Sequence, residues 1–589
     1  MLTTFTAPAF AGTWYIENGD IIVKAGDEGT NKVSQGTNKD VVDTGTVITG
    51  KSDKNTVTID AKDKDDKVEV TLKDVNIDAS SRSEAAVSVT GKGDTTIELD
   101  GDNELKSGAG HAGLEHNKTD TSGELTIQDK DKNGSLEAVG GFKGAGIGSA
   151  GSNDAQVKIT GGNITATSDD WGAGIGSGSY GTGTVEITGG EINATGGYLG
   201  AGIGGGCNGS GNVTISGGAI TAAGSDGAAG IGGGYYNGAT VTITGDAVIK
   251  NASNTKYGAG IGGGYGYDGD VTISGNAKIE NATGGYGAAG IGGGAFSSPD
   301  KIGNGNVVIK DNAKIDNVQG GAYGAGIGGG IYGLSNVTIE GNTKVNATGG
   351  AGGAAIGGGA GAENNSDNNG NQITIKSNEN GSPTINAVGG GTDEGEKIVI
   401  GGAGIGAGCE SNADADITLE GKVTITATAG KDNVAIGANG IEQEFSGLAE
   451  GSSITRYDPE GNDITLPTDP VPAVPSSSGG GSADASVQES VFPGLVVTDK
   501  DGQRISYTSI RDNNVLSLRV GRFTASLRAS LATLRQLRAE GIDTITFQTI
   551  LCSTTLSVDE LLAMGGEDTE VVLTHHIRSS TLTVGGKAV

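Results

Sequence analysis

The chain has 589 residues, of which 113 are glycine and only 9 are proline, and its formal net charge at pH 7 is −31. Glycine is far above the roughly 7% of average proteins, but no Gly-X-Y period accompanies it, which excludes collagen. The acidity argues against a nucleic-acid partner, because phosphate binding needs a basic surface. No run of 18 apolar residues is present, so no membrane-spanning helix is predicted.

The first residues resemble the end of a targeting segment. Ala9, Phe10 and Ala11 form an A-x-A cleavage signature in front of Gly12. A basic region before a short apolar stretch is missing, so residues 1–11 are interpreted as a signal-peptide remnant, with an ordinary N-terminal tail as the alternative. Together with the acidity and the scarcity of cysteine, this predicts an extracellular protein, secreted or displayed on a bacterial cell surface.

The segment Gly-Ala-Gly-Ile-Gly-Gly-Gly and its variants recur along most of the chain. The first intervals between the isoleucines are 28, 28, 28, 30 and 30 residues. A constant period of this size predicts a solenoid, in which each repeat packs only on its neighbours. The repeat isoleucines are Ile147, Ile175, Ile203, Ile231, Ile261, Ile291, Ile327, Ile356, Ile405 and Ile436.

Each repeat contains three short apolar pieces separated by glycine-rich turns, as in residues 213–215, 220–222 and 228–232. Alternation over two or three residues predicts very short strands and leaves no room for a helix. Three strands per coil predict a right-handed parallel β-helix over residues 12–450, with about fourteen coils stacked roughly 4.8 Å apart. Glycine in the third piece is expected to permit positive φ and close approach between coils.

The pattern is weaker toward the N-terminus and changes after the solenoid. Trp14, Tyr15 and Ile16 are expected to cover its open end. Residues 451–490 are predicted to be a Pro/Gly/Ser-rich linker, and residues 491–589 a small α+β accessory domain. In that domain a helix is expected over residues 526–539, with Gly541 as its C-cap. Strands are expected at Val515–Arg519 and at residues 544–547 and 571–573.

Aromatic residues gather on either side of the repeat isoleucines. One set precedes an isoleucine by four or five residues, and a second set follows it by the same distance. Stacked coils would turn each set into a column of rings beside the glycine face, which suits stacking against sugar rings. The alternative is that the rings only pack on one another. The sugar-stacking candidates are Trp171, Tyr198, Tyr257, Tyr286, Tyr323, Tyr180, Tyr236 and Tyr265.

Metal and cofactor motifs are weak. Asp129, Asp131 and Asn133 match the start of an EF-hand loop, but position 12 of that loop is Gly140 and no helices flank it. They are a candidate Ca²⁺ site, and an acidic turn is the alternative reading. The G-x-G-x-x-G matches in the repeats lack the following helix that a dinucleotide site needs. Ca²⁺ is therefore the one cofactor considered.

Asparagines and cysteines also fall at repeated positions. The sequons that begin at Asn193, Asn281 and Asn346 are equivalent in the repeat, so stacked asparagines that hydrogen-bond between coils are expected rather than glycosylation. Cys207 and Cys409 each lie four residues after a repeat isoleucine. They are interpreted as loop thiols at equivalent turns.

Support for catalysis is slight. Histidine occurs only as His111, His116, His575 and His576, and neither a nucleophile elbow nor an H-E-x-x-H motif is present. Whether the protein is an enzyme stays open, with a non-catalytic role favoured. A β-helical polysaccharide lyase or hydrolase would need a groove that holds three or more acidic residues together with a lysine or arginine.

The Gly-Ala-Gly-Ile-Gly-Gly-Gly repeats, with Val-x-Ile-x-Gly-Gly and Ile-x-Ala between them, resemble β-helical surface proteins of gut Firmicutes. Residues 14–140 are similar to clostridial carbohydrate-binding β-helix proteins, which are related in shape to pectate lyases. The resemblance implies binding of acidic plant polysaccharide and Ca²⁺ in the fold.

The favoured hypothesis is a monomeric, non-catalytic adhesin that binds a polysaccharide or another host or dietary glycan. A structural adhesin stalk without a sugar site and a β-helical lyase or hydrolase are the alternatives.

Overall fold

The computed structural model describes residues 11–27, 29–296, 301–364, 370–393, 400–470, 495–498, 507–512, 514–520, 524–549, 552–566, 569–576 and 579–588. The chain divides into two compact units, Met1–Asp463 and Ile464–Val589. We call them the solenoid unit and the C-terminal unit. In the described residues, no helix is long and apolar enough to span a membrane.

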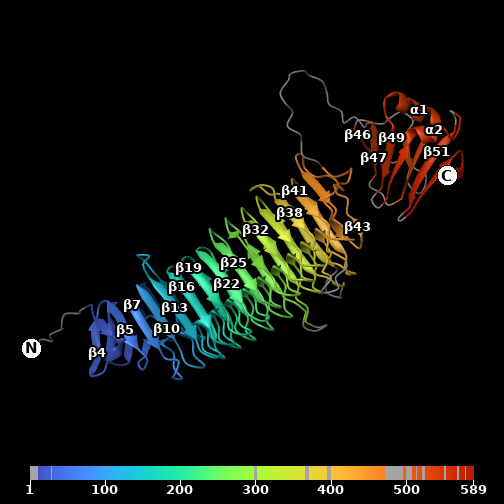
Figure 1. Cartoon of the computed structure of the whole chain (residues 1–589). Coiled ribbons are helices and arrows are strands. Elements are labelled where there is room, and N and C mark those ends of the chain that lie inside the picture. The colour runs from blue at the N-terminus through green and yellow to red at the C-terminus, as the bar shows by residue number, and fades with distance from the viewer. Residues whose placement is uncertain are drawn as a thin grey trace, which may run out of the picture. The chain divides into compact units, whose positions relative to one another are not determined.

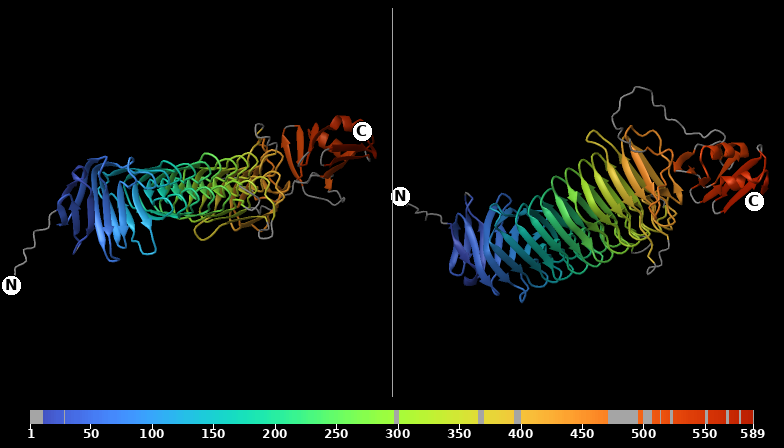
Figure 2. Two further views of the ribbon diagram at one scale, coloured as in Figure 1. Left: turned by 90° about the horizontal axis from the view of Figure 1, so that it is seen from below. Right: turned by 45° about the horizontal axis from the view of Figure 1, so that its top comes forward.

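The solenoid unit is a parallel β-helix, which confirms the predicted architecture (Figures 1 and 2). Each coil contributes to three columns of parallel strands. Column one contains β1 (Thr13–Tyr15), β5 (Thr46–Ser52), β7 (Lys67–Asp78), β9 (Asp94–Asp100), β12 (Leu125–Gln128), β15 (Asp154–Ile159), β18 (Gly183–Ile187), β21 (Gly211–Ile215), β24 (Ala239–Ile243), β27 (Gly269–Ile273), β31 (Gly305–Ile309), β34 (Ser335–Glu340), β37 (Asn371–Lys376) and β40 (Ala415–Glu420).

Column two continues from the second halves of β5 and β7. It contains β10 (Asp102–Lys106), β13 (Ser135–Gly140), β16 (Asn163–Ser168), β19 (Glu191–Thr195), β22 (Ala219–Gly224), β25 (Val248–Asn254), β28 (Lys278–Ile279), β29 (Ala282–Thr283), β32 (Lys314–Gln319), β35 (Lys344–Thr348), β38 (Thr384–Val388), β41 (Thr424–Thr428) and β44 (Ser453–Tyr457).

Column three holds the repeat isoleucines. It contains β2 (Ile21–Ala25), β6 (Val57–Ala61), β8 (Val87–Gly91), β11 (Leu114–Lys118), β14 (Ile147–Gly148), β17 (Ile175–Gly176), β20 (Ile203–Gly204), β23 (Ile231–Gly232), β26 (Ile261–Gly262), β30 (Ile291–Gly292), β33 (Ile327–Gly328), β36 (Ile356–Gly357), β39 (Ile405–Gly406) and β42 (Ile436–Ala438).

The core forms because equivalent apolar residues stack in register. Val213 lies opposite Val241, and Ile203 lies opposite Ile231. All four side chains are almost fully buried. Strands of columns one and two, such as β18 and β21, alternate between such inward residues and outward ones, as the period-2 pattern predicts.

Glycine in column three is a steric requirement. The glycine that ends each Ile-Gly strand from Gly148 to Gly406, and the equivalent Gly437, has a φ between +128° and +146°. Other residues almost never adopt this conformation. A Cβ on Gly232 would also lie 2.0 Å from the carbonyl oxygen of Gly262 in the next coil. The glycine therefore recurs in the motif because neighbouring coils lie too close together on this face for a side chain.

The N-terminal end is covered by two antiparallel strands, β3 (Asn31–Gln35) and β4 (Asn38–Asp43), which extend from β2. Trp14 and Ile16, which begins the short 3₁₀ turn η1 (Ile16–Asn18), are buried as expected. The indole nitrogen of Trp14 donates a hydrogen bond of 2.6 Å to the buried carboxylate of Asp43. The expectation for Tyr15 was wrong: its side chain is 49% exposed, because neighbouring residues of a strand face opposite sides.

The C-terminal end is closed by a buried ion pair. Arg456 lies opposite the core residue Ala427, its side chain is fully buried, and its guanidinium donates to Glu442 at 2.5 Å. Glu442, in the short strand β43 (Ile441–Glu442), also accepts the backbone N–H groups of Ala435 and Ile436. The solenoid therefore extends past the predicted boundary at residue 450, which an arginine at a core position concealed.

Replacing Arg456 with alanine is expected to lower the free energy of unfolding by about 3–5 kcal/mol, because it leaves the Glu442 carboxylate buried without its cation. Urea unfolding would measure this change. Arg82→Ala is the control: that arginine forms a partly exposed pair with Glu84, and its loss should cost less than about 1 kcal/mol. Equal effects of the two substitutions would contradict the assigned role of Arg456.

In its described residues, the C-terminal unit contains two sheets and two helices, α1 (Leu531–Ala539) and α2 (Val558–Leu562). The first sheet has the order β45 (Val496–Thr498), β48 (Ala525–Ser530), β51 (Glu570–His576), β52 (Ser579–Val584), β53 (Lys587–Ala588). The second has the order β46 (Thr508–Asp512), β47 (Val515–Arg519), β49 (Thr544–Gln548), β50 (Ser553–Ser557). Leucines of both helices share one core with both sheets.

The predicted helix over residues 526–539 begins too early, because residues 526–530 belong to β48. Leu527 is buried opposite Leu573 in the first sheet. Ser530 then caps α1: its hydroxyl accepts the N–H of Thr533 at 3.1 Å. Leu527 thus has the spacing from Leu531 and Leu534 that a helix would give, but it belongs to strand β48.

Candidate functional site

A turn precedes and a turn follows each Ile-Gly strand of column three. We call the turn before the isoleucine the first turn and the turn after it the second turn. First and second turns of neighbouring coils lie side by side. The N–H of Cys207, in the turn after Ile203, donates to the carbonyl of Trp171 in the turn before Ile175. The same bond joins Tyr265 to Gly227 in later coils. The second turn of one coil thus contacts the first turn of the preceding coil.

Aromatic side chains on these turns follow one another along the solenoid and form three groups of contacting rings. We call the whole set the aromatic strip. It comprises Phe142, Trp171, Tyr180, Tyr198, Tyr235, Tyr236, Tyr257, Tyr265, Tyr286, Phe296, Tyr323 and Tyr332. Ring centroids lie 5.3 Å apart for Phe142 and Trp171, 6.3 Å for Tyr257 and Tyr286, and 5.6 Å for Tyr286 and Tyr323. The predicted first-turn column therefore forms at both of its ends.

The second-turn rings also meet. Tyr236 lies 5.7 Å from Tyr265, and Tyr265 lies 5.1 Å from Tyr257 of the first-turn column. Tyr235 was not among the predicted candidates, although its ring lies 4.1 Å from Tyr236 and 5.4 Å from Tyr265. Its place directly before Tyr236 in the sequence was the signal that could have identified it.

Ten of the twelve strip rings pack on another ring, and the strip faces solvent. Tyr180 is 56% exposed and Tyr198 is 51% exposed. Phe142, Tyr257, Tyr286 and Tyr332 are also exposed, and the remaining rings are partly buried. The strip is thus both a packed layer and an accessible aromatic surface.

Several strip residues occupy turn positions that favour glycine. Trp171, Tyr180, Tyr236, Tyr323 and Tyr332 have φ between +60° and +71°. A bulky side chain in this left-handed region is uncommon and costs of order 1–3 kcal/mol. Equivalent turns in other coils use glycine with φ between +68° and +83°, or other residues with positive φ: Lys143, Leu199, Ser152, Asn208 and Glu410. The glycines are Gly266 and Gly361 in second turns, and Gly287 and Gly352 in first turns.

A groove of about 880 Å³ lies beside the second-turn rings. Its lining includes Asn212, Thr240, Tyr267, Asp268, Asp270 and Lys301. The Lys301 ammonium lies 5.2 Å from the ring centroids of both Tyr236 and Tyr267, so the groove adjoins the strip. The groove was not predicted from the sequence; the available signal was the interval from Ile291 to Ile327, which lengthens to 36 residues.

The Ca²⁺ candidate is an acidic turn with a third carboxylate. Glu98, Asp129 and Asp131 place carboxylate oxygens within 4.8 Å of one another. Asp129 accepts the backbone N–H groups of Asn133 and Gly134, and the Asn133 amide donates to Asp131. Carboxylate oxygens are ligands that Ca²⁺ prefers, but three carboxylates are fewer than the six to eight oxygen ligands that it takes. The Lys130 ammonium also lies 3.5 Å from the Glu98 carboxylate and competes for it. The site stays a prediction.

The predicted hydrogen bonds between asparagines and neighbouring coils are present at two of the three sequons, those of Asn281 and Asn346. The amide of Asn281 donates to the carbonyl of Lys250 in the preceding coil, and Asn317 donates to Asn281, each at 3.1 Å. Asn346 makes the same bond to the carbonyl of Asp316. These amides therefore connect neighbouring coils.

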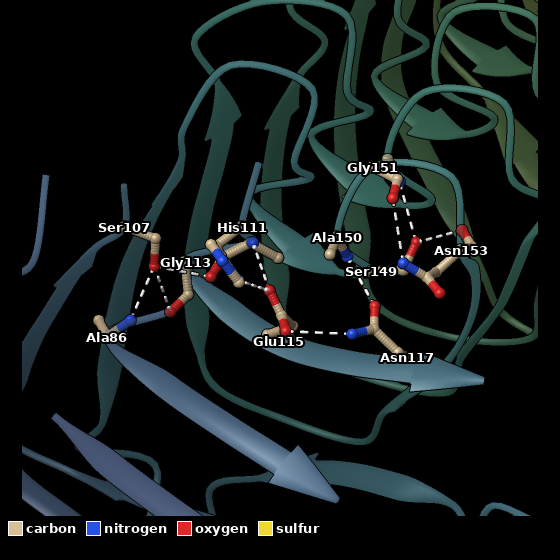
Figure 3. A network of polar contacts seen from close by, with 12 residues as sticks. Ala86, Ser107, His111, Gly113, Glu115, Asn117, Ser149, Ala150, Gly151 and Asn153 are labelled. Atoms are coloured by element: carbon tan, nitrogen blue, oxygen red, sulfur yellow. Dashed lines mark hydrogen bonds and ion pairs between the residues drawn. The ribbon is translucent and has the colours of Figure 1, made fainter. Parts of the chain in front are cut away.

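The two histidines of the solenoid unit make contacts within the fold. The His111 ring contacts the carboxylate of Glu115 at 2.8 Å (Figure 3). The same carboxylate accepts hydrogen bonds from the backbone N–H of Ala112 and the side-chain amide of Asn117, where β11 leaves column three. His116 is buried between the carbonyls of Val89 and Gly123, and burial lowers its pKa.

In the C-terminal unit, His575 lies between the hydroxyls of Thr549 and Thr554, and burial lowers its pKa as well. Among the described residues, neither it nor the two solenoid histidines is aligned with a serine or cysteine nucleophile.

Cys207 and Cys409 are buried in equivalent turns, and desolvation raises the pKa of each thiol to about 11. Both thiols are therefore protonated near pH 8 and unreactive, because only the thiolate is a nucleophile. Cys552 is partly exposed. A colorimetric thiol reagent is expected to titrate one cysteine in the native protein and three after denaturation. Rapid reaction of more than one native thiol would contradict the burial of the two turns.

A family model described as Beta helix repeat matches residues 157–179, 185–207, 213–235 and 271–295. Each match begins in a strand of column one and ends in the second turn of the same coil, so one match corresponds to one coil. The chain is thus a β-helical repeat protein. Comparisons with curated proteins and with solved structures gave no match.

Proposed function

We propose that the solenoid unit binds a polysaccharide without cleaving it, and that the aromatic strip is the contact surface. The observation that carries this proposal is the occupation of left-handed turn positions by five bulky aromatic residues. Glycine serves the same turns in other coils at no steric cost. Leu199 and Asn208 also occupy such turns, so the turn itself does not require an aromatic residue. A ligand therefore explains the repeated choice of an aromatic side chain.

The chemistry of the strip suits a sugar chain. Tyrosine offers a flat apolar ring and a hydroxyl that hydrogen-bonds, so it can stack on a pyranose ring and contact its hydroxyl groups. Each coil from that of Ile147 to that of Ile327 carries at least one ring, and successive coils lie about 4.8 Å apart. A polymer of similar rings matches such a repeating surface. Dietary and host polysaccharides are the proposed partners, and an extracellular or cell-surface adhesin the proposed setting.

The test is retention of the full chain on a panel of plant and host polysaccharides, with Ca²⁺ and with a chelator. Absorbance of unsaturated sugars and release of reducing ends would be followed in the same samples. Retention without product is expected, and product formation would move the function to a lyase or a hydrolase. Retention that disappears with chelator would assign Ca²⁺ a role in binding.

A structural stalk is the second candidate, and the contacts between strip rings favour it. A stalk needs these rings for packing alone, so no polysaccharide on the panel would be retained. The enzyme alternative requires three acidic residues and a cation in one groove. Of the described residues, the groove beside the strip holds Asp268, Asp270 and Lys301, one carboxylate short of that requirement.

A further inference from the structure

We propose that the groove beside the aromatic strip is a subsite for an uncharged polysaccharide and rejects polyuronates. This inference rests on the proposed function, because it names the class of glycan that the solenoid unit binds. It also departs from the family resemblance, which implies an acidic plant polysaccharide.

The groove exists because one repeat is longer than its neighbours. The interval from Ile291 to Ile327 is 36 residues, against 30 in the two preceding repeats. Lys301, Ile302 and Asn304, which precede β31 in this longer repeat, line the groove. In solenoids, insertions emerge as loops on one face, often the binding face. The groove is thus an addition to the coil that the fold itself does not require.

The floor offers groups that hydrogen-bond to hydroxyls. Asn212, Thr240 and Asp270 face outward from β21, β24 and β27, where they lie directly opposite one another in register. All three side chains are exposed. Within the described part of the chain, the Asn212 amide and the Thr240 hydroxyl have no hydrogen-bonding partner, so both are available to a ligand.

The groove runs along the solenoid axis and carries an aromatic side. Its lining spans β21, β24, β27 and the segment before β31 in four successive coils, which corresponds to about 14 Å at roughly 4.8 Å per coil. Tyr267 lines it, and Lys301 links Tyr267 to Tyr236 of the strip. A sugar chain can therefore lie in the groove and continue along the strip.

The charge of the groove opposes carboxylated sugars. Asp268 and Asp270 both line it, against the single described cation Lys301. Loss of hydration in the groove and the nearby charge of Asp270 raise the pKa of Asp268, even though its carboxylate reaches solvent. A second anion is thus already unfavourable there. The net charge of −31 extends the repulsion to a long polyuronate.

The test compares polymers that differ only in the carboxyl group. Each neutral polysaccharide of the panel is paired with its C6-oxidised derivative, and polygalacturonate with its carboxyl-reduced derivative. Binding to the full chain is measured at physiological salt with chelator present. The uncharged member of each bound pair is expected to bind at least tenfold more tightly. Asn212→Ala combined with Thr240→Ala should weaken that binding at least tenfold.

Thr184→Ala is the matched control, because Thr184 lies opposite Asn212 one coil outside the groove. It should leave binding unchanged. Equal or tighter binding of the carboxylated member would overturn the inference and leave the proposed function standing. So would a groove variant that binds as the wild type does. Failure of every polysaccharide to bind would remove the proposed function itself, and the two failures are therefore distinguishable.

Discussion

Replacing Gly232 with alanine is expected to lower the free energy of unfolding by more than about 4 kcal/mol, or to prevent folding. The backbone at Gly232 has a φ of +140°, and the added Cβ would lie 2.0 Å from the carbonyl oxygen of Gly262. That oxygen belongs to the next strand of column three, so it cannot move without separating two coils. Chemical denaturation followed by circular dichroism would measure the loss.

A matched substitution separates the two causes of this strain. Gly440 also has a positive φ, +71°, but no atom lies within 4 Å of the position that its Cβ would occupy. Gly440→Ala should therefore cost only about 1–2 kcal/mol, the price of the left-handed conformation alone. If Gly232→Ala were as mild as Gly440→Ala, close packing between coils would not explain the repeated glycine.

The solenoid could be predicted because its physical requirements recur in every coil. Buried isoleucine and valine must stack in register, and glycine must accept a conformation that other residues avoid. Each repeat, such as that around Ile203, therefore shows the same pattern. The C-terminal unit lacks this redundancy. There the spacing of Leu527 and Leu531 fits one helix, while the paired strands show that Leu527 belongs to a sheet.

The candidate site was only partly predictable. The contacts among Tyr257, Tyr286 and Tyr323 followed from the period, because residues at nearly equal offsets stack in successive coils. The left-handed backbone at Tyr180 and Tyr332 could not be predicted from the sequence, because glycine or asparagine is the residue that usually indicates this conformation. The groove was missed because a longer interval between isoleucines gives the size of an insertion but not the surface that it borders.

Replacing Tyr180 and Tyr332 together with glycine is expected to weaken polysaccharide binding about tenfold or more while leaving the fold as stable or more stable. Each exposed ring contributes about 0.5–1.5 kcal/mol of stacking, and about 1.4 kcal/mol corresponds to a factor of ten in affinity. Glycine relieves the strain of φ near +62° to +68° at these two turns. Affinity electrophoresis and thermal unfolding of the same variant would measure both effects.

Tyr15→Ala is the control, because Tyr15 is comparably exposed but belongs to β1 at the N-terminal end, outside the strip. It should bind polysaccharide as the wild type does. Most aromatic-to-glycine substitutions lose packing, so unchanged or higher stability would be unusual and would itself support the argument from backbone strain.

The combination of the two measurements decides between the candidate functions. A stalk that uses the rings only for packing predicts that the Tyr180/Tyr332 variant unfolds at a lower temperature and that neither protein binds sugar. A glycan-binding surface predicts the reverse, because residues selected for a ligand are kept at a cost to the fold. The left-handed tyrosines therefore offer a test in which stability and binding are expected to change independently, which a substitution in the core of the solenoid could not provide.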